Sequence, residues 1–230
     1  MSSFDPQHVG LKVGLEVHQQ LATGTKLFCG CGEFSAVNLD LEFDRRLRAT
    51  QSELGEIDPA ALFEFKKGTL FKYMAGPEAA CLVEADEEPP HDLNMEALES
   101  ALLIAFCLDS DVVDEVHVMR KIVIDGSNTA GFQRTMIIAL GGEVKVGKKI
   151  IPVQTISLEE DAARLVDQEP GVRRYALDRL CVPLVEVALA PFTGTPYEIQ
   201  DVALSVGRLM RATGRVARGL GTVRQDLNIS

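Results

Sequence analysis

The sequence predicts an α+β fold with a mainly antiparallel sheet and flanking helices. Two amphipathic helical patterns enclose a series of short strand-like segments, whose connections are too short for parallel crossovers. The 230 residues are 46% hydrophobic and 25% charged, which is typical of a globular protein able to bury its own core. The longest apolar run, residues 101–108, is far shorter than the roughly 20 residues of a membrane helix. We therefore expect no membrane span.

The first predicted strand, residues 11–21, has two different faces. Alternate positions are apolar, whereas Gly14, Glu16, His18 and Gln20 share the other face. Glu16 and His18 project in the same direction about 7 Å apart, close enough to reach one cation or one phosphate-bound metal. The same pattern also fits the ordinary polar face of a half-buried strand.

The cysteines indicate reduced thiols. They are five in number and no export signal is visible, so we expect a cytoplasmic protein without disulfides. The only close pair is Cys29 and Cys31, and a structural zinc site usually takes four ligands from two such pairs. Because the sequence shows no second pair, neither cysteine is assigned as a ligand. Cys107 lies in an apolar run and is expected to be buried.

The middle of the chain is predicted to contain a loop, a helix and several strands. Residues 84–90 are acidic and end in two prolines, which is typical of a solvated loop. Apolar residues recur at helical spacing over residues 94–108. Glycine-containing turns then separate short strands, which favours antiparallel pairing. The predicted strands are residues 121–124, 136–140, 143–146, 150–157 and 183–189.

Residues 125–134 form a polar loop framed by glycines. Its polar side chains include Ser127, Asn128, Thr129 and Arg134. Such a loop can present backbone N–H groups and hydroxyls to an anion, although it is not a Walker motif. A plain turn and a cradle for phosphate or carboxylate both remain open.

Acidic residues also interrupt predicted strands that are otherwise apolar. Glu186 is the single charge in residues 181–190, and a buried carboxylate needs a cation, a proton or a partner. Residues 159–161 are three adjacent acids, which repel one another unless something positive offsets them. Carboxylate-rich sites suit Mg²⁺ that is shared with a nucleotide phosphate. These features predict a metal- and nucleotide-dependent site without naming a reaction.

The second predicted helix is marked at both ends. Thr195 is the expected N-cap, Pro196 occupies the first helical position, Glu198 completes a capping box and Gly214 ends the helix. A final strand follows, residues 223–229, with a third polar face. Arg224, Asp226 and Asn228 lie on that face.

Charge is unevenly distributed along the chain. The net charge of −11 argues against binding nucleic acid by bulk charge alone. Residues 1–119 carry −14 and residues 120–230 carry +3, so an anionic ligand is expected in the second half. Arginines gather in or just beyond residues 202–223, a stretch without acids, although a solvated helix face would explain them equally well. They are Arg208, Arg211, Arg215, Arg218 and Arg224.

Several segments, in order from about residue 10 to the last residue, resemble the GatB/GatE family of glutamyl-tRNA(Gln) amidotransferase subunits. The wording Gly-Ser-Asn-Thr-x-Gly-Phe-Gln-Arg and Val-Arg-Gln-Asp-Leu-Asn-Ile favours the archaeal GatE branch over the bacterial and organellar GatB branch. The resembling segments are residues 13–21, 26–31, 125–135, 157–162, 183–187 and 219–230.

The resemblance implies an ATP- and Mg²⁺-dependent carbon–nitrogen ligase with glutamine or asparagine as amido donor. In this family, ATP phosphorylates the γ-carboxylate of glutamate carried by tRNA(Gln). Ammonia from the asparaginase-like amidotransferase subunit, GatD, then displaces phosphate to give glutaminyl-tRNA. The implied partners are Glu-tRNA(Gln) and GatD, in a heterodimer or heterotetramer.

The resemblance also implies roles for individual residues within a cradle-shaped catalytic domain. Glu16, His18, Glu160 and Glu186 match metal-binding positions. The strand that closes the cradle supplies two further catalytic candidates, and a loop lining it supplies four cofactor-binding candidates. These are Arg224 and Asp226 on the strand, and Ser127, Asn128, Thr129 and Arg134 in the loop.

Two departures from the family pattern matter. GatB relatives complete a zinc site with a second cysteine pair, which this sequence lacks. The family also continues beyond residue 230, so residues 1–230 are expected to be the N-terminal part of the cradle domain. The competing hypothesis is a non-catalytic piece that only docks GatD or tRNA. A stand-alone metal hydrolase is disfavoured because no nucleophile–base pair is identifiable.

Overall fold

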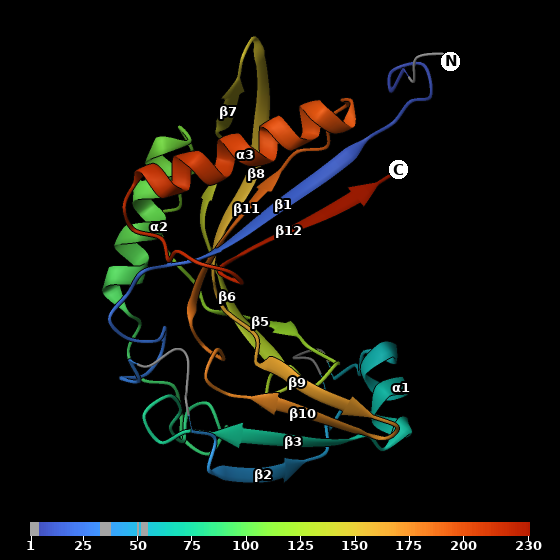
Figure 1. Ribbon diagram of the computed structural model, residues 1–230, viewed down its shortest axis with the longest axis vertical. Coiled ribbons are helices and arrows are strands. Elements are labelled where there is room, and N and C mark those ends of the chain that lie inside the picture. Colours follow the sequence, from blue (N-terminus) through green and yellow to red (C-terminus); the bar gives the residue numbers. More distant parts are fainter. Residues whose placement is uncertain (1–4, 33–37, 50, 52–54) are drawn as a thin grey trace.

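The computed structural model describes residues 5–32, 38–49, 51 and 55–230, which form two sheets and three helices (Figure 1). The strands of the larger sheet are β1 (Val13–Gln20), β4 (Asp111–Val112), β5 (Met119–Ile122), β6 (Phe132–Leu140), β7 (Glu143–Val146), β8 (Lys149–Glu160), β11 (Pro183–Leu189) and β12 (Val223–Ile229). Its strand order is β12-β1-β11-β8-β6-β4, with β5 paired to β6 and β7 paired to β8. Each of these pairs is antiparallel.

The smaller sheet has the order β2-β3-β10-β9. Its strands are β2 (Leu41–Arg45), β3 (Leu70–Ala75), β9 (Arg164–Glu169) and β10 (Val172–Ala176). The pairing of β3 with β10 is parallel, and the other two pairs are antiparallel. The predicted α+β fold with a mainly antiparallel sheet is therefore confirmed.

The three helices are α1 (Pro59–Lys67), α2 (Met95–Cys107) and α3 (Pro196–Ala212). Both predicted helices are present, and α3 has the predicted capping box between Thr195 and Glu198. The sequence did not indicate α1. That helix buries none of its residues, so it carries no apolar face that a periodic pattern could reveal.

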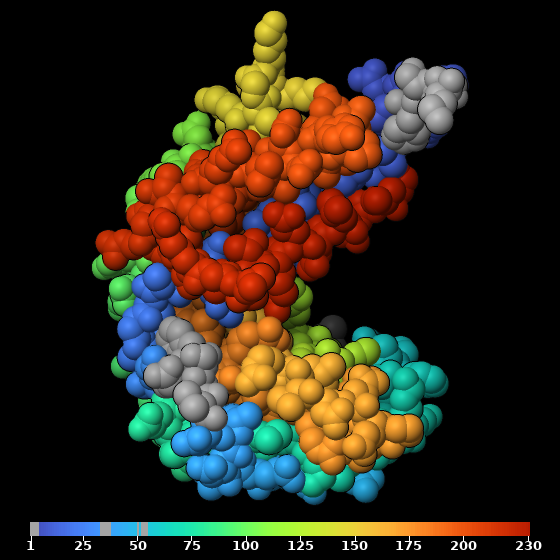
Figure 2. All heavy atoms as spheres, in the orientation of Figure 1, coloured from blue at the N-terminus to red at the C-terminus, as the bar shows by residue number. Residues whose placement is uncertain are grey.

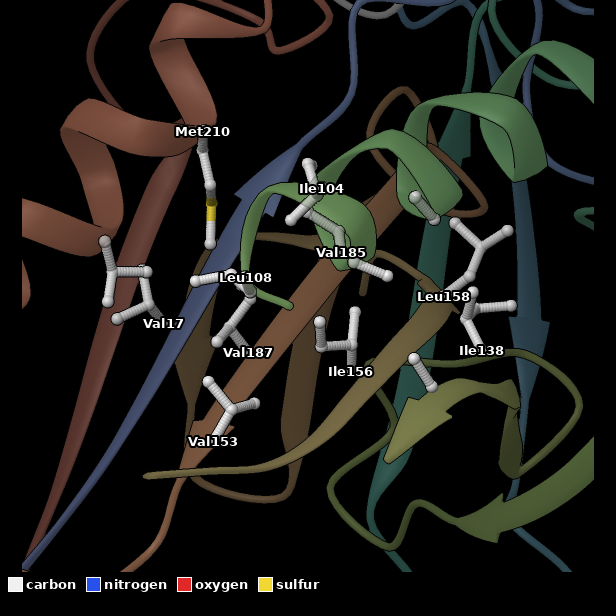
Figure 3. Packing of buried hydrophobic residues seen from close by; sticks show 14 of the residues in the cluster. Val17, Ile104, Leu108, Ile138, Val153, Ile156, Leu158, Val185, Val187 and Met210 are labelled. Carbon is white, nitrogen blue, oxygen red and sulfur yellow. The ribbon is translucent and has the colours of Figure 1, made fainter. Parts of the chain in front are cut away.

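Helices α2 and α3 pack on one face of the larger sheet. Ile104 from α2, Leu108 at the C-cap of α2 and Met210 from α3 lie against Val17, Val187 and other buried strand residues (Figure 3). Because side chains alternate along a strand, the polar residues next to Val17 and Val187 project from the opposite face. The helices thus leave the polar face of β1 and β11 uncovered.

A second apolar cluster supports the smaller sheet. Tyr73 stacks on Tyr175 with ring centroids 6.1 Å apart, and both rings pack with Phe71 and Leu177. The larger sheet with its helices and the smaller sheet form two lobes. Between them is a hollow that opens on one side, between β12 and the smaller sheet (Figure 2). None of the helices in the described part of the chain is both long and apolar enough to cross a membrane.

One expectation about burial is wrong and another is only partly right. Cys107 is exposed, because the buried face of α2 runs through Ala101, Ile104 and Ala105 and the helix turns Cys107 away from it. Residues 84–90 do form a loop in which residues 86–90 are exposed, but Glu84 at its start is completely buried. In both cases the composition of the segment concealed the environment of a single side chain.

Candidate functional site

Glu16, His18 and Glu186 come together on the uncovered face of the larger sheet. Strands β1 and β11 are antiparallel, and their register places His18 opposite Glu186. One ligand atom from each of the three residues lies within 4.8 Å of the others. His18 Nδ1 lies 3.7 Å from Glu186 Oε2. The two side chains predicted to share a face of β1 thus gain a third partner across the strand pair.

Strand β12, which pairs with the other edge of β1, brings the predicted residues Arg224 and Asp226 next to the cluster. Asp226 lies opposite Glu16 and Arg224 lies opposite His18. Asp226 Oδ2 is 3.3 Å from His18 Nε2. Arg224 Nη1 donates to Asp161 Oδ1 over 3.0 Å, so a buried acid holds this guanidinium beside the cluster.

His18 is the unusual member of the cluster. The residue is 7% exposed, and neither ring nitrogen has a hydrogen-bond partner within the described structure. Buried polar nitrogens without partners cost free energy, so most of those in proteins are hydrogen-bonded. Each nitrogen instead faces a carboxylate without forming a hydrogen bond to it. This environment fits a divalent cation held by imidazole and carboxylate groups.

Glu159 is a neighbour of the cluster that the sequence did not single out. Glu159 is on β8 and lies opposite Leu184 of β11. Because Leu184 and Glu186 are two residues apart on β11, Glu159 lies on the same face of the sheet as Glu186. Glu186 is 9% exposed, and burial raises its pKa to about 7, with the nearby Glu159 contributing further. Lys121 Nζ lies 3.9 Å from Glu186 and 4.0 Å from Glu159. A bound cation would favour the ionised form of both carboxylates.

Glu160 is directed elsewhere. Its carboxylate pairs with Arg134, whose Nη1 lies 2.9 Å away and whose backbone N–H donates to it over 3.0 Å. Both residues are buried, so the charge of Glu160 is already compensated. The structure does not bring Glu160 into the group formed by Glu16, His18 and Glu186. Its metal-binding role and the cofactor role of Arg134 stay predictions.

The loop over residues 125–131 docks on the smaller sheet. Ser127 Oγ donates to Asp125, and the Asn128 side chain accepts from the Ala130 N–H. Thr129 Oγ1 donates to the Glu84 carbonyl over 2.6 Å. Gly126 has φ +85°, and a Cβ there would lie 2.1 Å from the Phe71 ring, so only glycine fits. The predicted cofactor contacts of Ser127, Asn128 and Thr129 are not tested by these interactions.

A cavity of about 320 Å³ adjoins the cluster. Glu16 and Gly14 line it together with Lys12, Gln154 and Asn228. Ligand sites usually have volumes of about 300 to 1,000 Å³. A group bound there would contact both β1 and β12 beside Glu16.

Residues 11–230 match the family model described as the GatB/GatE catalytic domain. Over all 230 residues, the chain is 57% identical to a protein of Aeropyrum pernix. It is 54% identical to proteins of Saccharolobus islandicus (strain L.S.2.15 / Lassen #1) and Sulfolobus acidocaldarius. Each of these relatives is named as a glutamyl-tRNA(Gln) amidotransferase subunit of the GatE type, and the chain spans 36% of the length of each. The chain therefore belongs to the GatB/GatE family.

Proposed function

We propose that this chain contributes the cation- and ATP-binding part of a glutamyl-tRNA(Gln) amidotransferase subunit. In this proposal Glu16, His18 and Glu186 hold Mg²⁺, and the activated group is the γ-carboxylate of glutamate on tRNA(Gln). The observation that carries it is the buried imidazole of His18, whose two nitrogens lie unpartnered between carboxylates. The names of the relatives supply the substrate class.

The proposed reaction has two steps. The γ-carboxylate oxygen attacks the terminal phosphorus of ATP, which forms an acyl phosphate and releases ADP. Ammonia then attacks the acyl carbon, phosphate leaves, and glutaminyl-tRNA remains. Phosphorylation is needed because a carboxylate would otherwise have to expel oxide. The bound cation would supply neutralisation of negative charge on the transferred phosphoryl group.

Two basic side chains near the cluster, Lys121 and Arg224, support a phosphate-binding role in this proposal. Lys121 is 59% exposed at its side chain and has only long contacts with Glu159 and Glu186, so it can turn towards an incoming anion. Arg224 is on β12, the strand that also carries Asp226, and its guanidinium is held in place by an ion pair with Asp161. We assign Lys121 to the nucleotide and Arg224 to phosphate or to the acceptor end of tRNA.

Four arginines, called here the arginine row, lie on α3 and in the segment between α3 and β12. Arg208, Arg211, Arg215 and Arg218 are exposed, and none forms an ion pair with another described residue. The row is tied to the end of β1, because Ala22 N donates to the Arg215 carbonyl and Ala217 N donates to the Gln20 carbonyl. Unpaired guanidinium groups are typical contacts for the RNA backbone. We assign this row to the tRNA phosphates.

The cation site is tested in the full-length protein with GatD, Glu-tRNA(Gln) and γ-labelled ATP. Glu186→Gln and His18→Ala should lower phosphoryl transfer by roughly 100-fold or more, the usual size of a lost group at a charged transition state. Glu143→Gln, on the β7 hairpin away from the cluster, serves as the control and should leave the rate unchanged. Wild-type rates in both site variants would contradict the assignment.

Calorimetry of Mg²⁺-ATP with the 230-residue chain distinguishes the proposed nucleotide site from the hypothesis that the chain only docks GatD or tRNA. Binding that is lost in Glu186→Gln supports a nucleotide site within these residues. No detectable heat would favour a piece that only docks GatD or tRNA. The arginine row is tested separately, because Arg208→Glu with Arg211→Glu should weaken tRNA binding and flatten its salt dependence, while Lys145→Glu with Lys148→Glu should not.

A further inference from the structure

Asp161 is a buried acid in a connection between the two sheets. It is 2% exposed and follows β8 directly, in the segment that leads from β8 to β9. Its Oδ2 accepts from Gln20 Nε2 over 2.7 Å, and its Oδ1 accepts from the backbone N–H of Ala162 over 2.8 Å and from Arg224 Nη1 over 3.0 Å. A buried carboxylate needs such partners, and these three donors fix the direction of this one.

The backbone of Asp161 is also held in place. Two connections between the sheets, from β8 to β9 and from β10 to β11, are joined there by hydrogen bonds. The Asp161 N–H donates to the Val182 carbonyl over 2.8 Å, and the Cys181 N–H donates to the Asp161 carbonyl over 3.1 Å. Arg179 Nε donates to the Ala162 carbonyl over 2.8 Å and lies 3.8 Å from Asp161 Oδ2. Asp161 therefore has a fixed position from which it can direct another side chain.

Two neighbouring glutamines at the end of β1 both help to hold β12. Gln19 is 1% exposed, and its Nε2 donates to the carbonyls of Ala217 and Thr222, each over 3.1 Å, just before β12 begins. Gln20 projects from the other face of β1, where the cation cluster lies, and donates to Asp161. The first glutamine thus holds the backbone that leads into β12, and the second holds the acid that pairs with the arginine of this strand.

The side chain of Arg224 depends on this acid for its direction. Strand β12 is at the edge of the larger sheet, and every residue of it except Arg224 is exposed, so packing provides little constraint. Arg224 is half-buried, and Asp161 is the one carboxylate among the described residues with which it forms an ion pair. A long side chain on such a strand would otherwise take many rotamers and turn its charged end to water.

We propose that Asp161 is the positioning residue for Arg224, and that Gln20 keeps Asp161 in place. Arg224 lies opposite His18 in the pairing of β12 with β1, so a guanidinium held by Asp161 stays beside the cation cluster. The inference rests on the proposed function for its consequence, because Arg224 is assigned there to phosphate or to the acceptor end of tRNA. Asp161 is assigned to neither cation nor substrate, and its effect on the reaction passes through Arg224.

A purely structural ion pair is the alternative, and Asp178 provides a matched comparison. Asp178 is also 2% exposed, lies in the neighbouring connection from β10 to β11, and pairs with Arg164 Nη2 over 2.7 Å. Arg164 is on β9, in the smaller sheet. Replacing either acid by asparagine removes a buried charge from the same part of the fold, so a similar loss of stability is expected. Only the replacement of Asp161 should alter Arg224.

The direction of Arg224 is tested without an activity assay, in the full-length protein with GatD. The protein is treated with phenylglyoxal, which modifies arginine, and mass spectrometry of its peptides gives the rate at each position. Asp161→Asn should raise the rate at Arg224 roughly tenfold, as expected when a charged hydrogen bond is lost, and leave Arg208 unchanged. Asp178→Asn should raise the rate at Arg164 instead. An equal rate at Arg224 in wild type and in Asp161→Asn would overturn the proposal.

Gln20→Leu keeps the test decisive if Asp161→Asn does not fold. This variant leaves the acid in place and removes one of its donors, so Arg224 should be modified faster than in wild type, by a smaller factor than in Asp161→Asn. A wild-type rate at Arg224 in Gln20→Leu would contradict the part that Gln20 has in the proposal.

Kinetics tests the consequence for the reaction. Asp161→Asn and Arg224→Gln should each slow phosphoryl transfer about tenfold or more, and the double variant should be no slower than Arg224→Gln alone. Asp178→Asn should leave the rate unchanged in either background. Losses that multiply in the double variant would overturn the positioning role. Wild-type transfer in Arg224→Gln would contradict the assignment of Arg224 under the proposed function, and the modification rates would still decide whether Asp161 directs it.

Discussion

Glu84 and Glu186 are both buried carboxylates with a lysine nearby, yet their surroundings affect them in opposite ways. Lys26 is completely buried and lies 3.2 Å from Glu84, whose pKa is lowered. Lys121 is largely exposed and lies 3.9 Å from Glu186, whose pKa burial raises to about 7. The first carboxylate is saturated with donors, whereas the second faces another carboxylate, Glu159, and an unpartnered imidazole.

This difference favours a structural role for Glu84 and, under the proposed function, an exchange of cations at Glu186. A carboxylate enclosed by donors and a buried cation has a fixed charge and a fixed orientation. A carboxylate held among like charges is poised to gain a cation, and to lose it again as substrates turn over. The contrast supports the proposal of an exchangeable Mg²⁺ near Glu186, whereas Glu84 is a fixed carboxylate paired with Lys26.

The largest expected effect is the loss of stability when Lys26 is replaced, compared with the loss when Lys121 is replaced. Lys26→Met leaves the Glu84 charge buried without its cation, so the free energy of unfolding should fall by about 3 to 5 kcal/mol. Lys121→Met should change it by less than about 1 kcal/mol, because that ammonium is mostly solvated. Urea denaturation of the two variants checks this, and equal losses would remove the contrast between the sites.

A smaller effect is expected from Glu186→Gln without divalent cations. Because the pKa of Glu186 is raised to about 7, the folded chain binds this proton more tightly than the unfolded chain does. The contribution of Glu186 to the free energy of unfolding is therefore lost as pH rises from the pKa of this carboxyl in the unfolded chain to about 7, its pKa in the folded chain. The variant should melt a few degrees above wild type at pH 8 and show a smaller difference at pH 5. The same difference at both pH values would contradict the burial of an ionised Glu186.

The smallest effect is expected from Glu159→Gln on the titration of its neighbour. Removing the like charge should bring the pKa of Glu186 down, by less than about one unit because burial is the larger cause. Carbon-detected NMR of the labelled side-chain carboxyl measures it, with Glu143→Gln as the control. An unchanged Glu186 titration would show that Glu159 does not share the site.

The sequence predicted much of the fold, and it named all three residues that the structure brings together in the cluster. Alternation along β1 correctly placed Glu16 and His18 on one polar face, since side-chain direction follows from the strand period alone. Glu160 was named from the resemblance, and its metal-binding role stays a prediction. Cross-strand register does not follow from composition, so the sequence did not show that Glu159 shares the face of Glu186. These adjacent acids differ only by which side of β8 they occupy.

The burial of Glu84 was missed for a related reason. Cys81 and Glu84 reach Cys29 and Cys31 only through the folding of the segment after β3, and a glutamate in an acidic segment resembles solvated surface. The unexpected burial of Lys26 and Glu84 is visible only in three dimensions.

The central claim is that His18 is a ligand of an exchangeable divalent cation together with Glu16 and Glu186. Electron spin-echo measurements with Mn²⁺ in place of Mg²⁺ test it most directly, because they detect a nitrogen bonded to the metal. We expect a directly bound ¹⁴N signal in the wild-type protein and in His91→Gln, whose imidazole is exposed and elsewhere. The signal should vanish in His18→Gln. Bound Mn²⁺ without a nitrogen signal, or with one that persists in His18→Gln, would contradict the account.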